Sequence, residues 1–181
     1  MSTIGFIGTG HMGGALARAA AKSEHSVLLY DKNTACAQSL ATDIKATACT
    51  CAELVQACDM IFIGVKPQVL DALAKELRPL LEQSERKCLV SFLAGVSLAR
   101  LQEALGEHAM IRMMPNVAVS VGQGMVVYCT NAQVSKEQRE LFTALMSHAG
   151  KTDELSESLI DAATAVMGCG PAYADLFMEA L

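Results

Sequence analysis

A glycine-rich turn close to the start of the chain constrains the fold more than any other segment. The turn is a G-x-G-x-x-G pattern at residues 8–13, and it follows an apolar segment at residues 3–7. Residues 14–22 then read as a helix and residues 26–30 as a second strand, with Asp31 directly after it. Strand, glycine turn, helix, strand and terminal acid, with about 20 residues between turn and acid, form the fingerprint of a dinucleotide-binding unit.

Each glycine of this turn has a physical role in the interpretation. Gly8 permits the tight turn after the strand, Gly10 keeps the backbone open to a pyrophosphate, and Gly13 lets the helix lie close to the sheet. The N-terminus of the helix then offers free N–H groups and a positive dipole end to the phosphates. A glycine-rich turn without a ligand is the alternative interpretation.

Length, charge and composition exclude several classes of protein. The 181 residues suit one domain of about 150 residues with an additional piece, and 52% hydrophobic residues can fill a core. A net charge of −5 without a basic run argues against nucleic acid as a partner. No apolar run approaches the ~18 residues of a membrane span, and no signal-peptide pattern precedes the first strand. We therefore predict a cytoplasmic protein that does not bind membranes.

The seven cysteines are scattered and odd in number, which is typical of a reducing compartment rather than a disulfide framework. Cys49, Cys51 and Cys58 are close enough in sequence to suggest zinc. Their spacing lacks paired C-x-x-C motifs, so we predict no metal site.

Strand and helix patterns alternate along most of the chain. Thr50 and Ser135 each begin a capping box, and Ser97 can cap the helix between them. The alternation predicts an α/β fold with a doubly wound Rossmann-type sheet, mostly parallel and covered on both faces. The predicted strands after the second are residues 44–46, 59–65, 87–91, 109–113, 124–129 and 151–153.

The character of the sequence changes near Ser156, where helical patterns replace the alternation. A helix is predicted from there to Met167, a break at residues 168–171, and a further helix beyond. We predict a dinucleotide-binding Rossmann domain at residues 1–156 and the beginning of a helical domain at residues 157–181.

Four motifs resemble one family. They are VKPQ at residues 65–68, AGVS at 94–97, MPN at 114–116 and GPAY at 170–173. In this order they resemble pyrroline-5-carboxylate reductase, which reduces the cyclic imine 1-pyrroline-5-carboxylate to L-proline with NAD(P)H in the last step of proline synthesis. The resemblance implies a C-terminal all-helical domain that forms a homodimer or a higher homo-oligomer.

The resemblance also implies a set of binding residues. The pyrophosphate would be held by Ile7, Gly8, Thr9, Gly10, His11 and Met12. The adenosine half would lie along Gly64, Val65, Lys66 and Pro67. The nicotinamide side would be lined by Phe92, Leu93 and Ala94, and the substrate pocket would be bordered by Met114, Pro115 and Asn116.

Some features depart from the family. Its threonine- and glycine-rich segment, which holds the substrate carboxylate, has no counterpart in these 181 residues. The sequence is therefore expected to bind cofactor better than it catalyses. Cys169 stands where the family commonly has Ser, and Cys51 where some members place an Asn near the adenosine.

The implied chemistry needs little from catalytic side chains. The imine nitrogen is readily protonated, so the enzyme mainly has to align the nicotinamide with the imine carbon. We predict no catalytic residue. His11 is expected to face solvent or phosphate rather than take part in the chemistry. Lys66 either contacts substrate or phosphate or follows simple loop geometry before a proline. Asn116 either binds the nicotinamide amide or the substrate or forms a turn.

The choice of cofactor depends on Asp31. An acid at this position accepts ribose hydroxyls and repels a 2′-phosphate, which favours NAD. Lys32 and Asn33 follow it and can offset this effect, so we predict NADP, with NAD as the alternative. Two other functions stay open: another dehydrogenase of similar architecture, for which no lysine occurs between Glu154 and Leu181, and a non-catalytic nucleotide-binding module.

Overall fold

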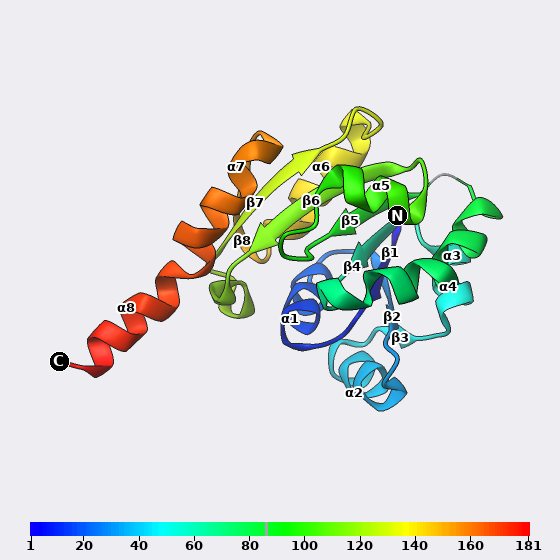
Figure 1. The fold of residues 1–181 in the computed structure, drawn as a ribbon. Helices are drawn as coiled ribbons and strands as arrows, with labels where there is room; N and C mark the ends of the chain where they lie inside the picture. The colour runs from blue at the N-terminus through cyan, green and yellow to red at the C-terminus, as the bar shows by residue number, and fades with distance from the viewer. Residues whose placement is uncertain (86) are drawn as a thin grey trace.

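The computed structural model describes residues 1–85 and 87–181, and within them eight strands form one sheet (Figure 1). The strands are β1 (Thr3–Ile7), β2 (Ser26–Tyr30), β3 (Thr47–Ala48), β4 (Met60–Ile63), β5 (Cys88–Ser91), β6 (Ala109–Pro115), β7 (Gly124–Thr130) and β8 (Gly150–Glu154). Their order in the sheet is β3-β2-β1-β4-β5-β6-β7-β8. Neighbouring strands are parallel except for β6 and β7. The predicted Rossmann-type, mostly parallel sheet is confirmed.

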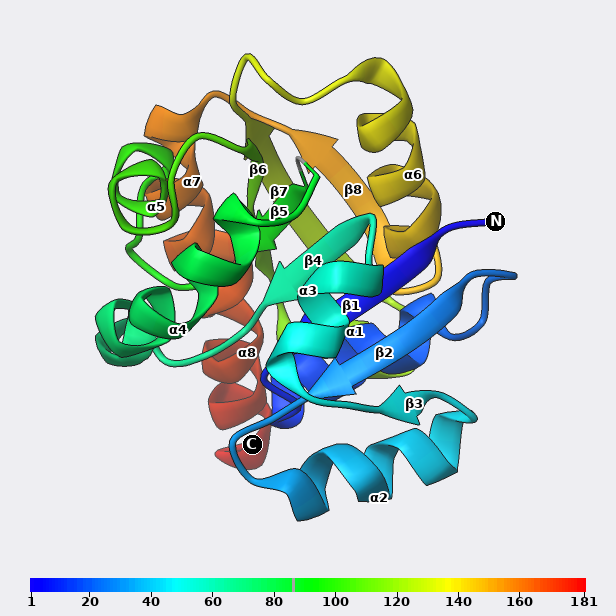
Figure 2. The ribbon, with the colours of Figure 1, turned by 90° about the vertical axis from the view of Figure 1, so that its right-hand side faces the viewer.

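Helices cover both faces of the sheet (Figure 2). The helices are α1 (His11–Ala20), α2 (Thr34–Ile44), α3 (Cys51–Ala57), α4 (Leu70–Glu82), α5 (Leu98–Leu105), α6 (Lys136–Met146), α7 (Glu157–Ala163) and α8 (Gly170–Glu179). Apolar residues of α1, α2 and α6 form one core cluster with the sheet. Residues of α3, α4, α5 and α7 form a second cluster on the opposite face. The central strands are consequently buried on both sides, as parallel strands usually are.

The predicted helix caps are present. The Thr50 hydroxyl accepts a hydrogen bond from the backbone of Glu53, whose carboxylate accepts one from the backbone N–H of Thr50. Ser135 and Gln138 form the same reciprocal pair at α6, and the Ser97 hydroxyl caps α5. These local patterns fix where each helix begins.

Several predicted strand boundaries are wrong: the strand predicted at residues 59–65 covers only Met60–Ile63, and two other strands differ in a more informative way. The predicted strand at residues 44–46 is the end of α2, which stops because Lys45 adopts a left-handed conformation with φ 57°. The strand beginning at Ala109 does not stop before Met114 but continues through Pro115. Antiparallel pairing with β7 extends it, since Met114 pairs with Val127. The sequence of β6 alone carries no signal of that pairing.

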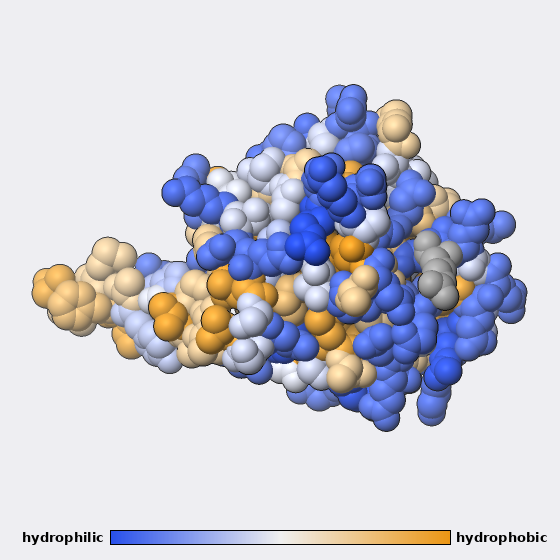
Figure 3. All heavy atoms as spheres, turned by 90° about the horizontal axis from the view of Figure 1, so that it is seen from above, coloured by the Kyte–Doolittle hydropathy of each residue, from blue (hydrophilic) through white to orange (hydrophobic). Residues whose placement is uncertain are grey.

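The C-terminal helices continue where a break was predicted. After α7, residues Thr164–Gly168 form a π-helical turn, and Pro171 lies in the first turn of α8, where its missing N–H costs nothing. Helix α8 projects away from the sheet, and its surface is largely apolar (Figures 1 and 3). Large side chains on it are exposed, including those of Tyr173, Leu176 and Phe177. None of the helices in the described part of the chain has the length and apolar character needed to cross a membrane.

Candidate nucleotide-binding site

The glycine turn joins β1 to α1 with almost no free space around it. Gly8 has φ +95°, and a Cβ atom there would lie 2.8 Å from the carbonyl oxygen of Gly64. A Cβ at Gly13 would lie 2.1 Å from the carbonyl oxygen of Gly8. Both positions therefore require glycine, one for its backbone conformation and the other for the close approach of helix and turn.

Gly10 differs because its surroundings are open. A Cβ there would meet no atom within 4 Å. Gly10 is the N-cap of α1 but offers no side-chain cap, and the first turn of the helix carries no acidic residue. The first N–H groups of a helix have no partner within the helix, so this end of α1 can accept an anion.

Asp31 contacts the glycine turn directly. Its Oδ2 accepts hydrogen bonds from the backbone N–H of Thr9 at 2.6 Å and from the Thr9 hydroxyl at 3.0 Å. Its Oδ1 accepts one from the backbone N–H of Asn33 at 2.9 Å. The carboxylate thus holds the loop after β2 against the turn after β1.

A cleft of about 400 Å³ opens beside this turn, at the carboxyl ends of β1, β2 and β4. It brings together eight of the predicted binding residues: Ile7, Gly8, Gly10, Asp31, Lys32, Gly64, Val65 and Lys66. A smaller hollow of about 300 Å³ lies on the other side of Asp31, between α2 and the start of α3. Asp31 therefore stands between two spaces that a nucleotide can enter.

Five further residues line the cleft and were not predicted from the sequence. They are Tyr30, Val69, Ala72, Leu73 and Glu76. Four of them recur at helical spacing on α4 or just before it. Tyr30 ends β2, and its hydroxyl donates a hydrogen bond to Glu76 Oε1 at 3.0 Å.

The other predicted cofactor residues lie around the rim. His11 is the exposed first residue of α1, and Met12 behind it is half-buried. Asn33 is the exposed N-cap of α2. Lys66 is exposed, and Pro67 begins the short 3₁₀ helix Pro67–Val69 that leads into α4.

The predicted nicotinamide residues lie after β5 and outside the cleft. The half-buried Phe92 ring packs against Gly64, directly after β4, since a Cβ at Gly64 would lie 2.0 Å from Phe92 Cζ. The Leu93 side chain is buried in the core, so only its backbone can face a ligand. Ala94 is exposed.

The predicted substrate residues lie at the end of β6 and directly after it. Met114 and Pro115 are buried residues of β6. Asn116 pairs with Met125, because its side-chain oxygen accepts a hydrogen bond from the Met125 N–H at 3.0 Å and its own N–H donates to the Met125 carbonyl. These contacts hold Asn116 against β7, directly before the short 3₁₀ helix Val117–Val121.

Comparisons with known proteins identify the family. A family model described as NADP oxidoreductase, coenzyme F420-dependent, matches residues 3–95. Pyrroline-5-carboxylate reductase of Synechocystis sp. is 41% identical over 129 residues, which cover 71% of this chain and 47% of that protein. The enzyme of Pisum sativum is 33% identical over 183 residues, covering 99% of this chain and 66% of the enzyme. The crystal structure of Plasmodium falciparum pyrroline carboxylate reductase with NADP bound is 31% identical, with a TM-score of 0.84, and is matched over 99% of this chain and 67% of its own.

The chain belongs to the pyrroline-5-carboxylate reductase family.

The chain spans about half to two thirds of the length of the curated reductases that it matches. Its fold superimposes on the matched reductase over nearly all residues, including the C-terminal helices. The cleft and the glycine turn are therefore features of the part that these reductases share with it.

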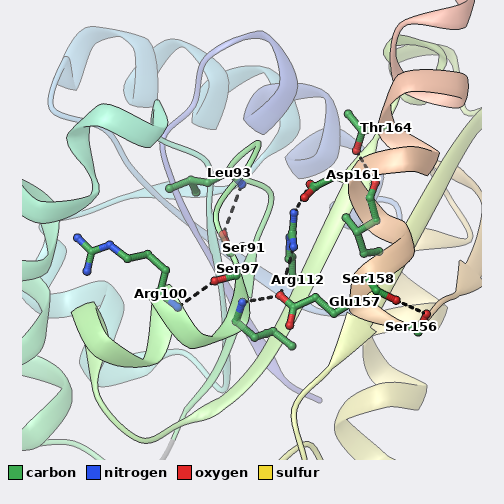
Figure 4. A network of polar contacts seen from close by, with 12 residues as sticks. Ser91, Leu93, Ser97, Arg100, Arg112, Ser156, Glu157, Ser158, Asp161 and Thr164 are labelled. Carbon is green, nitrogen blue, oxygen red and sulfur yellow. Dashed lines mark hydrogen bonds and ion pairs between the residues drawn. The ribbon is translucent and has the colours of Figure 1, made fainter.

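One buried ion-pair network in this family chain was missed by sequence reasoning (Figure 4). Arg112, in the middle of β6, has only 4% of its side chain exposed and pairs with Glu157 at 3.2 Å and with Asp161, both on α7. Glu157 Oε1 also accepts a hydrogen bond from the N–H of Leu98 at the start of α5. The sequence signal that could have revealed the network is Arg112 itself, a single charged residue within an otherwise apolar strand. The network ties β6, α5 and α7 together beside the loop that follows β5.

Proposed function

We propose that this protein is a pyrroline-5-carboxylate reductase, which transfers a hydride from NAD(P)H to 1-pyrroline-5-carboxylate and forms L-proline. The observation that carries the proposal is the open N-terminus of α1 beside a cleft that Asp31 lines, in a chain of this reductase family. The small-molecule substrate is inferred from the matched relatives.

The residues present fit a dinucleotide. Gly10 leaves the approach to α1 free of side-chain atoms, and the first N–H groups of the helix can bind the pyrophosphate. Asp31 can accept hydrogen bonds from ribose hydroxyls, and Lys66 can neutralise phosphate charge at the rim. When bound, the reduced nicotinamide supplies the hydride to the imine carbon, and a proton on the ring nitrogen completes the amine. The chain itself contributes by holding the cofactor so that the nicotinamide is aligned with the imine carbon.

For the cofactor we propose NADP, with NAD as the alternative. Asp31 disfavours a 2′-phosphate, and Lys32, which lines the same cleft, opposes that effect. The Plasmodium falciparum relative was solved with NADP bound. We assign cofactor contacts to the sets around Gly8, Asp31, Gly64 and Phe92 described above, and substrate contacts to Met114, Pro115 and Asn116.

We further propose two domains, residues 1–156 and 157–181, and association of copies through the second. The apolar surface of α8 supports this, because exposed contiguous apolar patches mark interaction sites. Analytical ultracentrifugation should find a homodimer or larger species, and a monomer at micromolar concentration would contradict it. A reducing, cytoplasmic location is supported by seven free cysteines; fractionation of cells that express the protein tests this.

The activity is tested on the protein extended to the full length of its relatives. It should oxidise NADPH in the presence of 1-pyrroline-5-carboxylate, and at high pH it should reduce NADP⁺ with L-proline. A protein that binds NADPH but catalyses neither reaction would overturn the proposed activity and leave a nucleotide-binding module.

A further inference from the structure

One wall of the cleft is apolar and ends at a carboxylate. Val65 follows β4, and Val69, Ala72 and Leu73 present small or branched side chains along α4 and its leading turn. Glu76 lies one helical turn beyond Ala72 and lines the same cleft. Apolar walls with few polar groups are typical of sites for flat ligands, in which the polar groups set specificity.

The carboxylate is held in place from across the cleft. Tyr30 ends β2, and its hydroxyl donates a hydrogen bond to Glu76 Oε1 at 3.0 Å. A phenol is protonated at neutral pH and can donate, and burial, together with this contact to Glu76, raises the pKa of Tyr30 further, from 10.0 to about 12. Cys51, at the start of α3, also lies beside Glu76, and its pKa is raised to about 12, chiefly by burial. Glu76 thus has neutral donors as neighbours and no described ion-pair partner.

The order of groups along the cleft matches the order of groups in an adenine dinucleotide. Asp31 contacts the glycine turn through Thr9, and the neighbouring Tyr30 contacts Glu76, so the end of β2 lies between the turn and the apolar wall with Glu76. A pyrophosphate at the turn and a ribose at Asp31 would place the base against Val69 and Leu73. The edge of that base then faces Glu76.

We propose that Glu76, oriented by Tyr30, selects adenine by accepting a hydrogen bond from its 6-amino group. The inference rests on the proposed function, because it assumes that a dinucleotide occupies this cleft. An ionised carboxylate can only accept hydrogen bonds. Adenine presents an amino donor at position 6, whereas hypoxanthine and guanine present a carbonyl acceptor there. The carboxylate therefore favours adenine and repels a 6-oxo purine.

The test compares two reduced dinucleotides that differ only at this position. NADH and reduced nicotinamide hypoxanthine dinucleotide are titrated into the full chain, and nicotinamide fluorescence gives each Kd. The wild type should bind the adenine form about tenfold more tightly, the usual effect of one charge-assisted hydrogen bond. Glu76→Gln should reduce that preference to about twofold, because an amide can donate to the carbonyl. Glu82→Gln, on the same helix but outside the cleft, should keep the wild-type preference.

The outcomes separate this inference from the proposed function. Equal binding of both dinucleotides by the wild type would overturn the role of Glu76 and leave the proposed function standing. Binding of neither, together with no binding of NADPH in the same titration, would overturn the proposed function itself. Tyr30→Phe gives a second test that does not depend on the folding of Glu76→Gln. This variant keeps the aromatic ring but removes the hydrogen bond to Glu76, so the preference for the adenine dinucleotide should fall about threefold. An unchanged preference for adenine would contradict the orienting role of Tyr30.

Discussion

Asp31 accepts two hydrogen bonds from Thr9, one from the backbone N–H and one from the hydroxyl. The acid that ends β2 therefore does more than face a ribose, because it also fixes the second residue of the glycine turn. Charge at Asp31 and the shape of the phosphate-binding turn are coupled through this contact. A substitution at Asp31 should affect both the choice of cofactor and the affinity for either cofactor.

The cofactor preference should shift when the carboxylate is removed. In Asp31→Ser the repulsion of a 2′-phosphate is lost, so the ratio of NADH to NADPH dissociation constants should rise about tenfold. Affinity for NADH should itself fall severalfold, because the Thr9 N–H loses its acceptor. Fluorescence titration of both cofactors measures the two effects. The control is Asp43→Ser, which removes an exposed ion pair between Asp43 on α2 and Arg18 on α1. This variant should leave the ratio of dissociation constants unchanged. An unaltered ratio in Asp31→Ser would exclude a role in discrimination.

The close contact between Gly64 and Phe92 should show as a stability coupling. In Gly64→Ala the new Cβ would meet the Phe92 ring at 2.0 Å, and overpacking of this kind costs about 2 kcal/mol of unfolding free energy. Phe92→Leu removes the ring atoms that clash, so the double variant should be at least about 1 kcal/mol more stable than additivity predicts. Urea unfolding of the four proteins measures this coupling.

Gly14→Ala is the matched control for the comparison of Gly64→Ala, Phe92→Leu and their double variant. A Cβ at Gly14 would make only ordinary contacts at 3.5 Å and beyond, within α1. Alanine in a helix interior should therefore be neutral or stabilising by up to about 1 kcal/mol. Additive effects of Gly64→Ala and Phe92→Leu would show that the ring moves aside without cost.

The sequence was sufficient for the parts of the site that depend on local backbone geometry. The glycine turn, the acid after β2 and the capping boxes are encoded within a few residues, because each follows from the conformation or hydrogen bonding of its own segment. Tyr30 and Glu76 were missed because their contact joins residues 46 positions apart, and each is unremarkable in its own element. The length of β6 was misjudged for a similar reason, since its end depends on pairing with β7. Leu93 was assigned to the site by resemblance, but the packing of its side chain is set by the whole core.

The Arg112 network should be asymmetric in its energetics. Arg112 is buried, whereas the side chains of Glu157 and Asp161 are 35% and 70% exposed. Replacing both acids, in Glu157→Gln/Asp161→Asn, leaves a buried guanidinium without a charged partner and should cost about 3 kcal/mol. Arg112→Met should cost less, because the two freed carboxylates can reach water. Urea unfolding measures both variants, and Arg100→Met at a more exposed pair serves as the control, with little change expected. A larger loss in Arg112→Met than in the double variant would contradict this asymmetry.

The buried thiols should make the protein lose stability in alkaline solution. Burial raises the pKa of Cys58 and Cys88 from 9.0 to about 12. Below pH 9 the thiols are neutral in both states and their full contribution is present. Between pH 9 and 12 only the unfolded chain releases these protons, so the free energy of unfolding should fall by up to about 1.4 kcal/mol per pH unit for each thiol.

Cys88→Ala removes one such thiol, and the free energy of unfolding of this variant, measured in urea with a reductant, should decline less steeply between pH 9 and 11. The exposed Cys36 provides the comparison, since Cys36→Ala should keep the wild-type slope. Parallel curves for wild type and Cys88→Ala would show that this thiol ionises equally well in the folded protein.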